Sequence, residues 1–326
     1  MEGRLIGLDA LRGIAAVAVF LHHLHMSATG HSTGSAFLAV DLFFMLSGYV
    51  MARTYELRMH GGLSPLRFAV LRWKRLWPTM TVGAAIGIPV VWTYYSAPEA
   101  AGAMLGLLLI PFFLGPRVFP VNGPAWSIFF ELVANALHAV LLYRLSNRLL
   151  WLLAAVSAFV LVLWGMDYGL DVGSRPENFL AGIPRVLLSY TMGILLWRMW
   201  QDKPRIAVSQ SFALLAMPIF FTATTFIQGQ SWIANLAFIL TICPMMIAGA
   251  LRFQAAAFWS SLAVFAGAAS FPLYAVHGSA LRLANLLGLG WVAGGCAALL
   301  ITLAFPSVRR ALPTIALPQK RGALGT

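Results

Sequence analysis

Charged residues are scarce in this chain. Only 10% of its 326 residues are Asp, Glu, Lys or Arg, whereas 60% are apolar. An ordinary soluble domain has about 25% charged residues, and a soluble fold of this size could not cover its surface with so few. The composition therefore excludes a soluble protein. It predicts an all-α, polytopic integral membrane helical bundle, with no room for a large soluble module at either end.

Cysteine and acidic residues are also few. The two cysteines, Cys243 and Cys296, both fall inside apolar runs. This excludes a disulfide framework and a cysteine metal site, so we expect both to be buried apolar residues. The net charge of +12 would suggest nucleic acid in a soluble protein. Here the basic residues lie between apolar runs, so membrane topology explains them and no nucleic-acid partner is expected.

Repeats and low-complexity segments are lacking, which weakens the case for an inverted-repeat transporter. Long apolar runs are abundant, and about 20 such residues cross the hydrocarbon core as a helix. The predicted spans are 6–26, 36–52, 78–95, 124–143, 149–165, 180–199, 208–226, 231–250, 258–285 and 288–305. The run 103–114 is shorter and contains Pro111. The first span resembles a signal peptide but lacks a cleavage site, so we expect it to be retained.

Basic residues predict the orientation of these ten spans. The segment between the second and third spans contains Arg53, Arg58, Arg67, Arg72, Lys74 and Arg75. The positive-inside rule places that segment in the cytoplasm. If 103–114 lies along the interface, the later clusters of Arg and Lys also fall on the cytoplasmic side. If 103–114 crossed the membrane, some of these clusters would lie on the opposite side. We therefore expect both termini in the cytoplasm, a transmembrane domain over 1–310 and a short basic cytoplasmic tail over 311–326.

Ionisable side chains inside spans are costly, at least ~2.5 kcal/mol each on insertion scales, and are candidates for function. The predicted spans contain Asp9, Arg12, His22, His23, Asp41, Glu131, His138, Arg185 and His277. From the helical rise per residue, we expect histidines to gather with Asp41 and Glu131 in the outer half. Arg12, Arg72 and Arg75 gather at the inner face.

This distribution predicts a site with two parts. A histidine oriented by a carboxylate can act as a general base on a hydroxyl, and arginines bind phosphate bidentately. A phosphorylated carrier held at the inner face, with its reactive end near an outer base, suits group transfer across the membrane. Two simpler interpretations stay open. Asp9 and Arg12 can neutralise each other, and Arg72, Lys74 and Arg75 can lie on anionic lipid.

No metal is expected in this site. His22, His25 and His31 lie close together in the sequence, but no carboxylate or cysteine completes a ligand set with them. Because His22 and His23 are adjacent on one helix, at most one of them points into the bundle.

Five motifs follow one another in the chain. They are LDALRGIAAVAVFLHHLHM with Asp9, Arg12 and His23; DLFFMLSGYVM from Asp41; LRWKRLWP with Arg72 and Arg75; PAWSIFFE with Trp126, Ser127 and Glu131; and SFPLYAVH with Ser270, Tyr274 and His277. Together they resemble the acyltransferase-3 family of bacterial inner-membrane acyltransferases, over nearly the whole chain. The ten residues between Arg12 and its histidine select His23 over His22.

The resemblance implies a stand-alone O-acyltransferase of the bacterial inner membrane, with no permanently bound cofactor. Its donor would be acetyl-CoA or another acyl-CoA, and its acceptor a hydroxyl of a sugar, glycolipid or secondary metabolite. The implied roles are CoA-phosphate binding by Arg12, Arg72 and Arg75, proton removal by His23, orientation of His23 or acceptor binding by Asp41 or Glu131, and substrate binding by Trp126, Ser127, Tyr274 and His277.

The alternative is a proton-coupled exporter of a glycan or small metabolite, in which the buried histidines and carboxylates relay protons. The pair Arg72 and Arg75 favours the acyltransferase, because a proton relay has no need of it.

Overall fold

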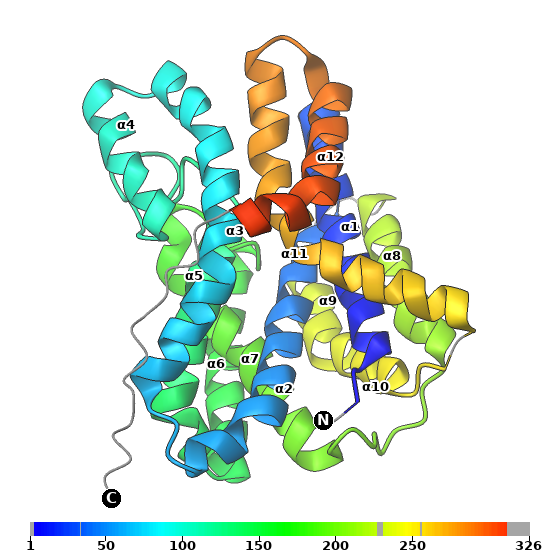
Figure 1. Ribbon diagram of the computed structural model, residues 1–326. Coiled ribbons are helices and arrows are strands. Elements are labelled where there is room, and N and C mark those ends of the chain that lie inside the picture. The colour runs from blue at the N-terminus through cyan, green and yellow to red at the C-terminus, as the bar shows by residue number, and fades with distance from the viewer. Residues whose placement is uncertain (1–2, 33, 227–230, 255, 312–326) are drawn as a thin grey trace, which may run out of the picture.

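The computed structural model describes residues 3–32, 34–226, 231–254 and 256–311, with side chains as far as Phe305 (Figure 1). Every regular element within these residues is helical, which confirms the prediction of an all-α fold. The tail predicted over 311–326 lies outside the described residues beyond Ala311, so it stays a prediction.

The helices follow one another with short connections, some of them single turns of 3₁₀ or π-helix, labelled η. In chain order the elements are α1 (Ile6–Thr29), η1 (Ala36–Leu38), α2 (Ala39–His60), α3 (Pro65–Tyr94), α4 (Ala97–Ala103), η2 (Met104–Leu108), α5 (Ala125–Val140), η3 (Leu142–Arg144), α6 (Asn147–Tyr168), η4 (Pro176–Ala181), α7 (Gly182–Trp200), α8 (Gln210–Phe226), α9 (Trp232–Ala237), η5 (Phe238–Ile242), α10 (Cys243–Leu251), α11 (Ala257–Leu286) and α12 (Gly290–Ala311).

Seven helical stretches of the described chain are long and apolar enough to cross a membrane. They are Ile6–Thr29, Ala36–His60, Pro65–Tyr94, Asn147–Tyr168, Pro176–Trp200, Trp232–Leu251 and Ala257–Leu286. Three other predicted spans, 124–143, 208–226 and 288–305, correspond to shorter apolar helices. The number of ten spans and the cytoplasmic position of the termini therefore stay predictions. The run 103–114 forms only the end of a short helix, because regular structure stops at Leu108.

The third predicted span begins too late in the sequence. Helix α3 starts at Pro65 and continues through Pro78, so the basic motif is itself helical. Ser64 caps the helix by accepting a hydrogen bond from the backbone N–H of Arg67 at 3.3 Å, and proline is favoured at the first helical position. Arg72 and Arg75 consequently lie about one turn apart on a single long helix.

Helices α1 and α11 bring the first and last motifs together. A Cβ atom on Gly267 would lie 2.6 Å from the Cβ of Asp9, and one on Gly13 would collide with Ala266. Small residues let membrane helices approach this closely. Beyond this contact the two helices run in the same direction, as Figure 1 shows for the blue and orange segments. Their far ends are joined by a hydrogen bond from Asn285 to Ser27 at 2.8 Å.

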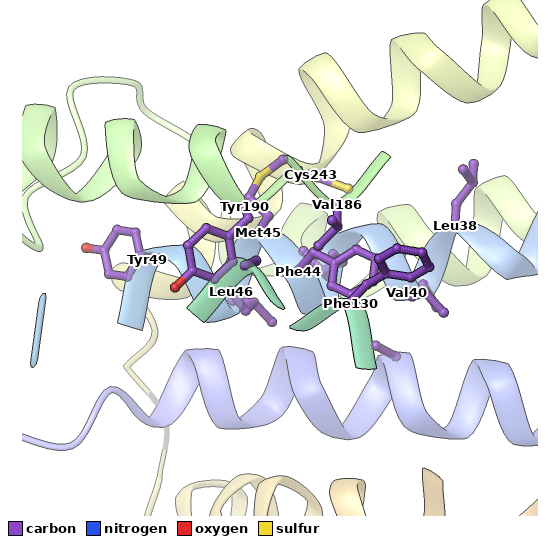
Figure 2. Close-up of a cluster of buried hydrophobic side chains, with 14 of the residues drawn as sticks. Leu38, Val40, Phe44, Met45, Leu46, Tyr49, Phe130, Val186, Tyr190 and Cys243 are labelled. Carbon is purple, nitrogen blue, oxygen red and sulfur yellow. The ribbon is translucent and has the colours of Figure 1, made fainter. Parts of the chain in front are cut away.

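Helices α2 and α7 form the second close pair. Cβ atoms on Gly48 and Gly193 would overlap backbone carbonyl groups of the opposite helix, at Tyr190 and Met45 respectively. Figure 2 shows the apolar core that surrounds this contact, with side chains from α2, α5, α7 and α10. This pair holds the second motif in the centre of the bundle.

The two cysteines differ from each other. Cys243 is buried in this core, as predicted, whereas Cys296 is exposed on α12, so that prediction was wrong. The sequence pattern could not separate the two cases. An apolar run facing lipid has the same composition as one facing the protein interior.

Candidate functional site

A cavity of about 520 Å³ lies between α1, α2, α3, α5, α11 and α12. We call it the arginine cavity, because its lining includes Arg4, Arg12, Arg72 and Arg75. Other lining residues with polar side chains are Asp9, Ser47, Thr79, Ser127, Glu131, Ser270, Tyr274 and Thr302. The structure thus brings the three arginines predicted to act together to one cavity, from two helices distant in the sequence.

Positive charge exceeds negative charge in the arginine cavity, where four arginines face two carboxylates. Asp9 accepts a hydrogen bond from Arg4 at 2.6 Å and another from Arg12 at 3.1 Å. The expected pairing of Asp9 with Arg12 is therefore present, but Asp9 is shared between two guanidinium groups. The excess charge suits an anionic ligand.

Arg72 is the best-placed cation of the cavity. Its side chain is buried, with 4% of the residue exposed, and it donates to Glu131 at 2.9 Å. Its Nε atom, also buried, has no hydrogen-bond partner among the described residues. Buried donors are normally satisfied, so this N–H is available to a ligand oxygen. Burial also argues against the lipid-surface interpretation for Arg72, whereas its neighbours Lys74 and Arg75 are exposed.

A pair of histidines, His23 and His277, lies further along α1 and α11, and we call it the histidine pair. Nε2 of His277 is 3.1 Å from Nδ1 of His23. Each Nδ1 atom also lies 3.0 Å from the backbone carbonyl four residues earlier, at Val19 and Leu273 respectively. The structure therefore makes His277 the direct partner of His23.

These contacts assign the ring protons of the neutral histidine pair. A carbonyl oxygen can only accept, so His277 carries its proton on Nδ1 and accepts at Nε2. Nδ1 of His23 faces two acceptors and carries the proton of that ring. Nε2 of His23 then retains a lone pair and can take a proton from a substrate.

The predicted orientation of His23 by Asp41 or Glu131 was wrong, while acceptor binding by these carboxylates stays a prediction. Asp41 accepts hydrogen bonds from Arg185 and Ser189 instead, while Glu131 accepts from Arg72 and from Ser47, the latter at 2.8 Å. The reason is electrostatic. Burying a guanidinium group costs a large desolvation free energy unless a carboxylate lies close enough to compensate its charge. Asp41 and Glu131 are thereby each paired with an arginine rather than with His23.

Arg185 is a central residue to which the sequence assigned no role. The exposed fractions of the Arg185 and Asp41 side chains are 1% and 0%, and the closest N···O distance between them is 2.8 Å. Arg185 also donates to the carbonyl oxygens of Phe37 and Val172. Its guanidinium lies 5.4 Å from the ring of Trp126. The signal in the sequence was an arginine within a predicted span, which requires a buried carboxylate partner.

The residues predicted to bind substrate occupy different places. The hydroxyl groups of Ser127 and Tyr274 are 2.6 Å apart, and both residues line the arginine cavity. The ring of Tyr274 also lies 5.8 Å from that of His277. Tyr274 therefore lies next to both the arginine cavity and His277, although neither histidine of the pair lines the cavity. Trp126 packs against Arg185 and lies outside the residues that line the cavity.

Within the described part of the chain, no three His, Cys, Asp or Glu side chains come together as a metal site. The polar groups are arginines, paired carboxylates, hydroxyls and the histidine pair, which are suited to binding anions and transferring protons.

Comparison with known proteins assigns this arrangement to a family. A family model described as an acyltransferase domain matches residues 5–308. A stretch of 189 residues is 34% identical to Protein 2 in the picA locus of Rhizobium radiobacter and covers 51% of this chain and 96% of that protein. A stretch of 109 residues is 31% identical to the peptidoglycan O-acetyltransferase OatA of Listeria monocytogenes, covering 32% of this chain and 16% of OatA.

A third relative is BcsY of Komagataeibacter xylinus, whose name assigns it provisionally to the membrane-bound transacylases. It is 26% identical over 229 residues, which cover 65% of this chain and 56% of BcsY. No solved structure matches the chain.

The pair of Asp41 and Arg185 generates a prediction that separates a structural role from a catalytic one. Asp41→Asn removes the countercharge of a buried guanidinium, and breaking such a pair costs about 3–5 kcal/mol. We expect a clear fall in the thermal unfolding midpoint of the purified protein. The control is Asp167→Asn, at an exposed position, which should leave the midpoint unchanged. An Asp41→Asn protein with wild-type stability and no acyl transfer would show that Asp41 acts in the chemistry.

Proposed function

This chain belongs to the acyltransferase-3 family of membrane acyltransferases, and we propose that it transfers an acetyl group from acetyl-CoA to a hydroxyl of a cell-envelope glycan or glycolipid. The observation that carries the proposal is the arginine cavity, in which a buried guanidinium keeps an unused N–H. OatA supports the choice of acetyl group and glycan acceptor, because its name describes acetyl transfer to peptidoglycan.

The phosphate groups of the donor would lie at the arginine cavity. Arg12, Arg72 and Arg75 present guanidinium groups there, and this group binds phosphate oxygens in a bidentate manner. Arg75 is exposed while Arg72 is buried, so the two would hold outer and inner phosphate groups respectively. We propose that this end of the bundle faces the cytoplasm of a bacterial inner membrane, where acyl-CoA is present.

The acyl end of the donor would extend toward the histidine pair. Arg12 and His23 are about 16 Å apart along the axis of α1, at 1.5 Å per residue, a distance that the extended pantetheine arm of CoA would bridge. The thioester would pass Ser127 and Tyr274. Ser127 donates to the carbonyl oxygen of Pro124 at 3.0 Å, which leaves Tyr274 as the donor to Ser127 at 2.6 Å. Either hydroxyl group would turn from this partner to donate to the thioester carbonyl oxygen as it gains negative charge. Glu131 would serve by holding Arg72 in position, since their ion pair is 2.9 Å long.

The transfer itself would use His23 as a general base. Nε2 of His23 takes the proton of the acceptor hydroxyl while its oxygen attacks the thioester carbonyl carbon. The new C–O bond forms and the C–S bond breaks, and the departing CoA thiolate receives the proton from His23. His277 holds the ring of His23 in place throughout, because it accepts from Nδ1. The arginine cavity also favours this reaction over proton-coupled export, which has no use for an unpaired guanidinium donor.

Donor binding is the first test of this proposal. We expect acetyl-CoA to bind the detergent-purified protein in calorimetry, and Arg72→Ala to weaken binding at least tenfold, because a charge-assisted hydrogen bond is lost. Arg148→Ala, which removes an exposed arginine elsewhere, should bind as the wild type does. Equal affinity in the Arg72→Ala and wild-type proteins, both folded, would remove Arg72 from the donor site.

The base is tested separately by substitution of His23. His23→Ala should reduce acetyl transfer by a factor of 10²–10⁴, the usual contribution of a general base, while acetyl-CoA affinity stays unchanged. The readout is release of free CoA in membranes supplied with the acceptor. His60→Ala, at an exposed histidine outside the site, should retain full activity. Full activity of His23→Ala would exclude the proposed base.

A further inference from the structure

A second cavity lies on the other side of α1, and we call it the α1–α8 groove. Its volume is about 890 Å³, within the range of roughly 300–1,000 Å³ typical of ligand sites. It is bounded by α1, α8 and the first part of α11, which crosses α1 in Figure 1. None of its lining residues lines the arginine cavity.

The lining of the α1–α8 groove changes character along its length. On α1 it runs from Ala10 to His25, which is about 22 Å at 1.5 Å per residue. Its polar side chains are His22 and His25 on α1 and Thr222 and Thr225 on α8. All four lie toward the C-terminal ends of their helices, and the remainder of the wall is apolar. This pattern fits an elongated apolar ligand that has a polar group at one end.

The depth of the α1–α8 groove comes from small residues. Ala10, Gly13 and Ala263 line it and are buried, so the groove enters the helix packing instead of lying on a flat face. Its length of about 22 Å exceeds one leaflet of the hydrocarbon core, which is about 15 Å. A single extended alkyl chain of the length found in membrane lipids would fill it, so the choice of lipid depends on the head group at the polar end of the groove.

The polar end of the α1–α8 groove adjoins the histidine pair. His22 lines the groove, and its ring centroid is 5.1 Å from that of His23. A polar head at this end would be one side chain away from the proposed base. Helix α1 thus separates two cavities, one lined by Arg12 and the other by Ile14 and Val17.

We infer that the α1–α8 groove holds the long apolar tail of a glycolipid, and that the acceptor hydroxyl belongs to the sugar of this lipid. The inference rests on the proposed function and makes it more specific, because it selects a lipid-linked acceptor over soluble metabolites. Donor and acceptor would reach His23 from opposite sides of α1, which permits both to be bound at once.

Binding of hexadecyl β-glucoside tests the inference directly. We expect the radiolabelled glucoside to bind the protein in phosphatidylcholine nanodiscs. Val17→Trp and Leu214→Trp, which fill the groove from its two walls, should each weaken this binding at least tenfold. The matched control is Val156→Trp on α6, since Val156 is 51% exposed and Val17 is 48% exposed. This control should bind the glucoside as the wild type does.

Two competitors and the donor complete the experiment. Methyl β-glucoside, which lacks the tail, should not displace the labelled lipid. Competition by phosphatidylglycerol as strong as that by unlabelled glucoside would show that bulk lipid fills the groove and would overturn the inference. So would equal glucoside binding by the groove variants and the control. All variants should keep wild-type affinity for acetyl-CoA, and its loss in folded groove variants would contradict two separate cavities.

The glucoside and donor measurements also fail independently of each other. If wild-type protein bound the glucoside in the groove but never bound acetyl-CoA, the proposed donor would fall while the groove assignment stood. If acetyl-CoA bound and the glucoside did not, the acceptor inference alone would fall.

Discussion

An ionised side chain inside a helical membrane bundle needs a countercharge at close range, because no water is present to compensate it. This constraint organises the centre of the bundle. Asp41 pairs with Arg185, Glu131 with Arg72, and Asp9 with Arg4 and Arg12. With the carboxylates of the bundle centre occupied in this way, the histidine pair depends on its own hydrogen bonds. The arginine cavity keeps an excess of positive charge.

The division of charge separates binding from chemistry along a single helix. Helix α1 carries Arg12 at the arginine cavity and His23 at the histidine pair, and the contact between α1 and α11 keeps His277 in register with His23. The arginine cavity would attract an anion, while the histidine pair offers a neutral imidazole with an available lone pair. A long carrier molecule satisfies both ends at once, and this is the physical basis for proposing acyl-CoA.

Much of this arrangement could be predicted from the sequence. The helical class follows from the composition. The rise per residue along each span gives the depth of a side chain, and it places Arg12 at the same depth as Arg72 and Arg75, and the histidines at a common depth further out. The partner of each charge could not be predicted. Asp41 and Arg185 are far apart in the sequence, and only tertiary packing determines that Asp41 meets Arg185 rather than His23.

The start of α3 shows a different limit. The third span was predicted to begin at Pro78. The helix instead begins at Pro65, with Ser64 as its N-cap, and so includes the basic motif that contains Arg72 and Arg75. Local signals of this kind compete with one another, and tertiary packing decides which one takes effect. The outcome matters for the site, because it places Arg72 in the protein interior instead of on the lipid surface.

The central claim is that one molecule reaches from the arginine cavity to the histidine pair. An electron cryo-microscopy structure of the protein in nanodiscs with bound CoA would test it most directly. We predict that the phosphate groups contact Arg12, Arg72 and Arg75, and that the thiol lies beyond Ser127 and Tyr274, next to His23. CoA phosphates bound away from these arginines, or a thiol pointing out of the bundle, would contradict it.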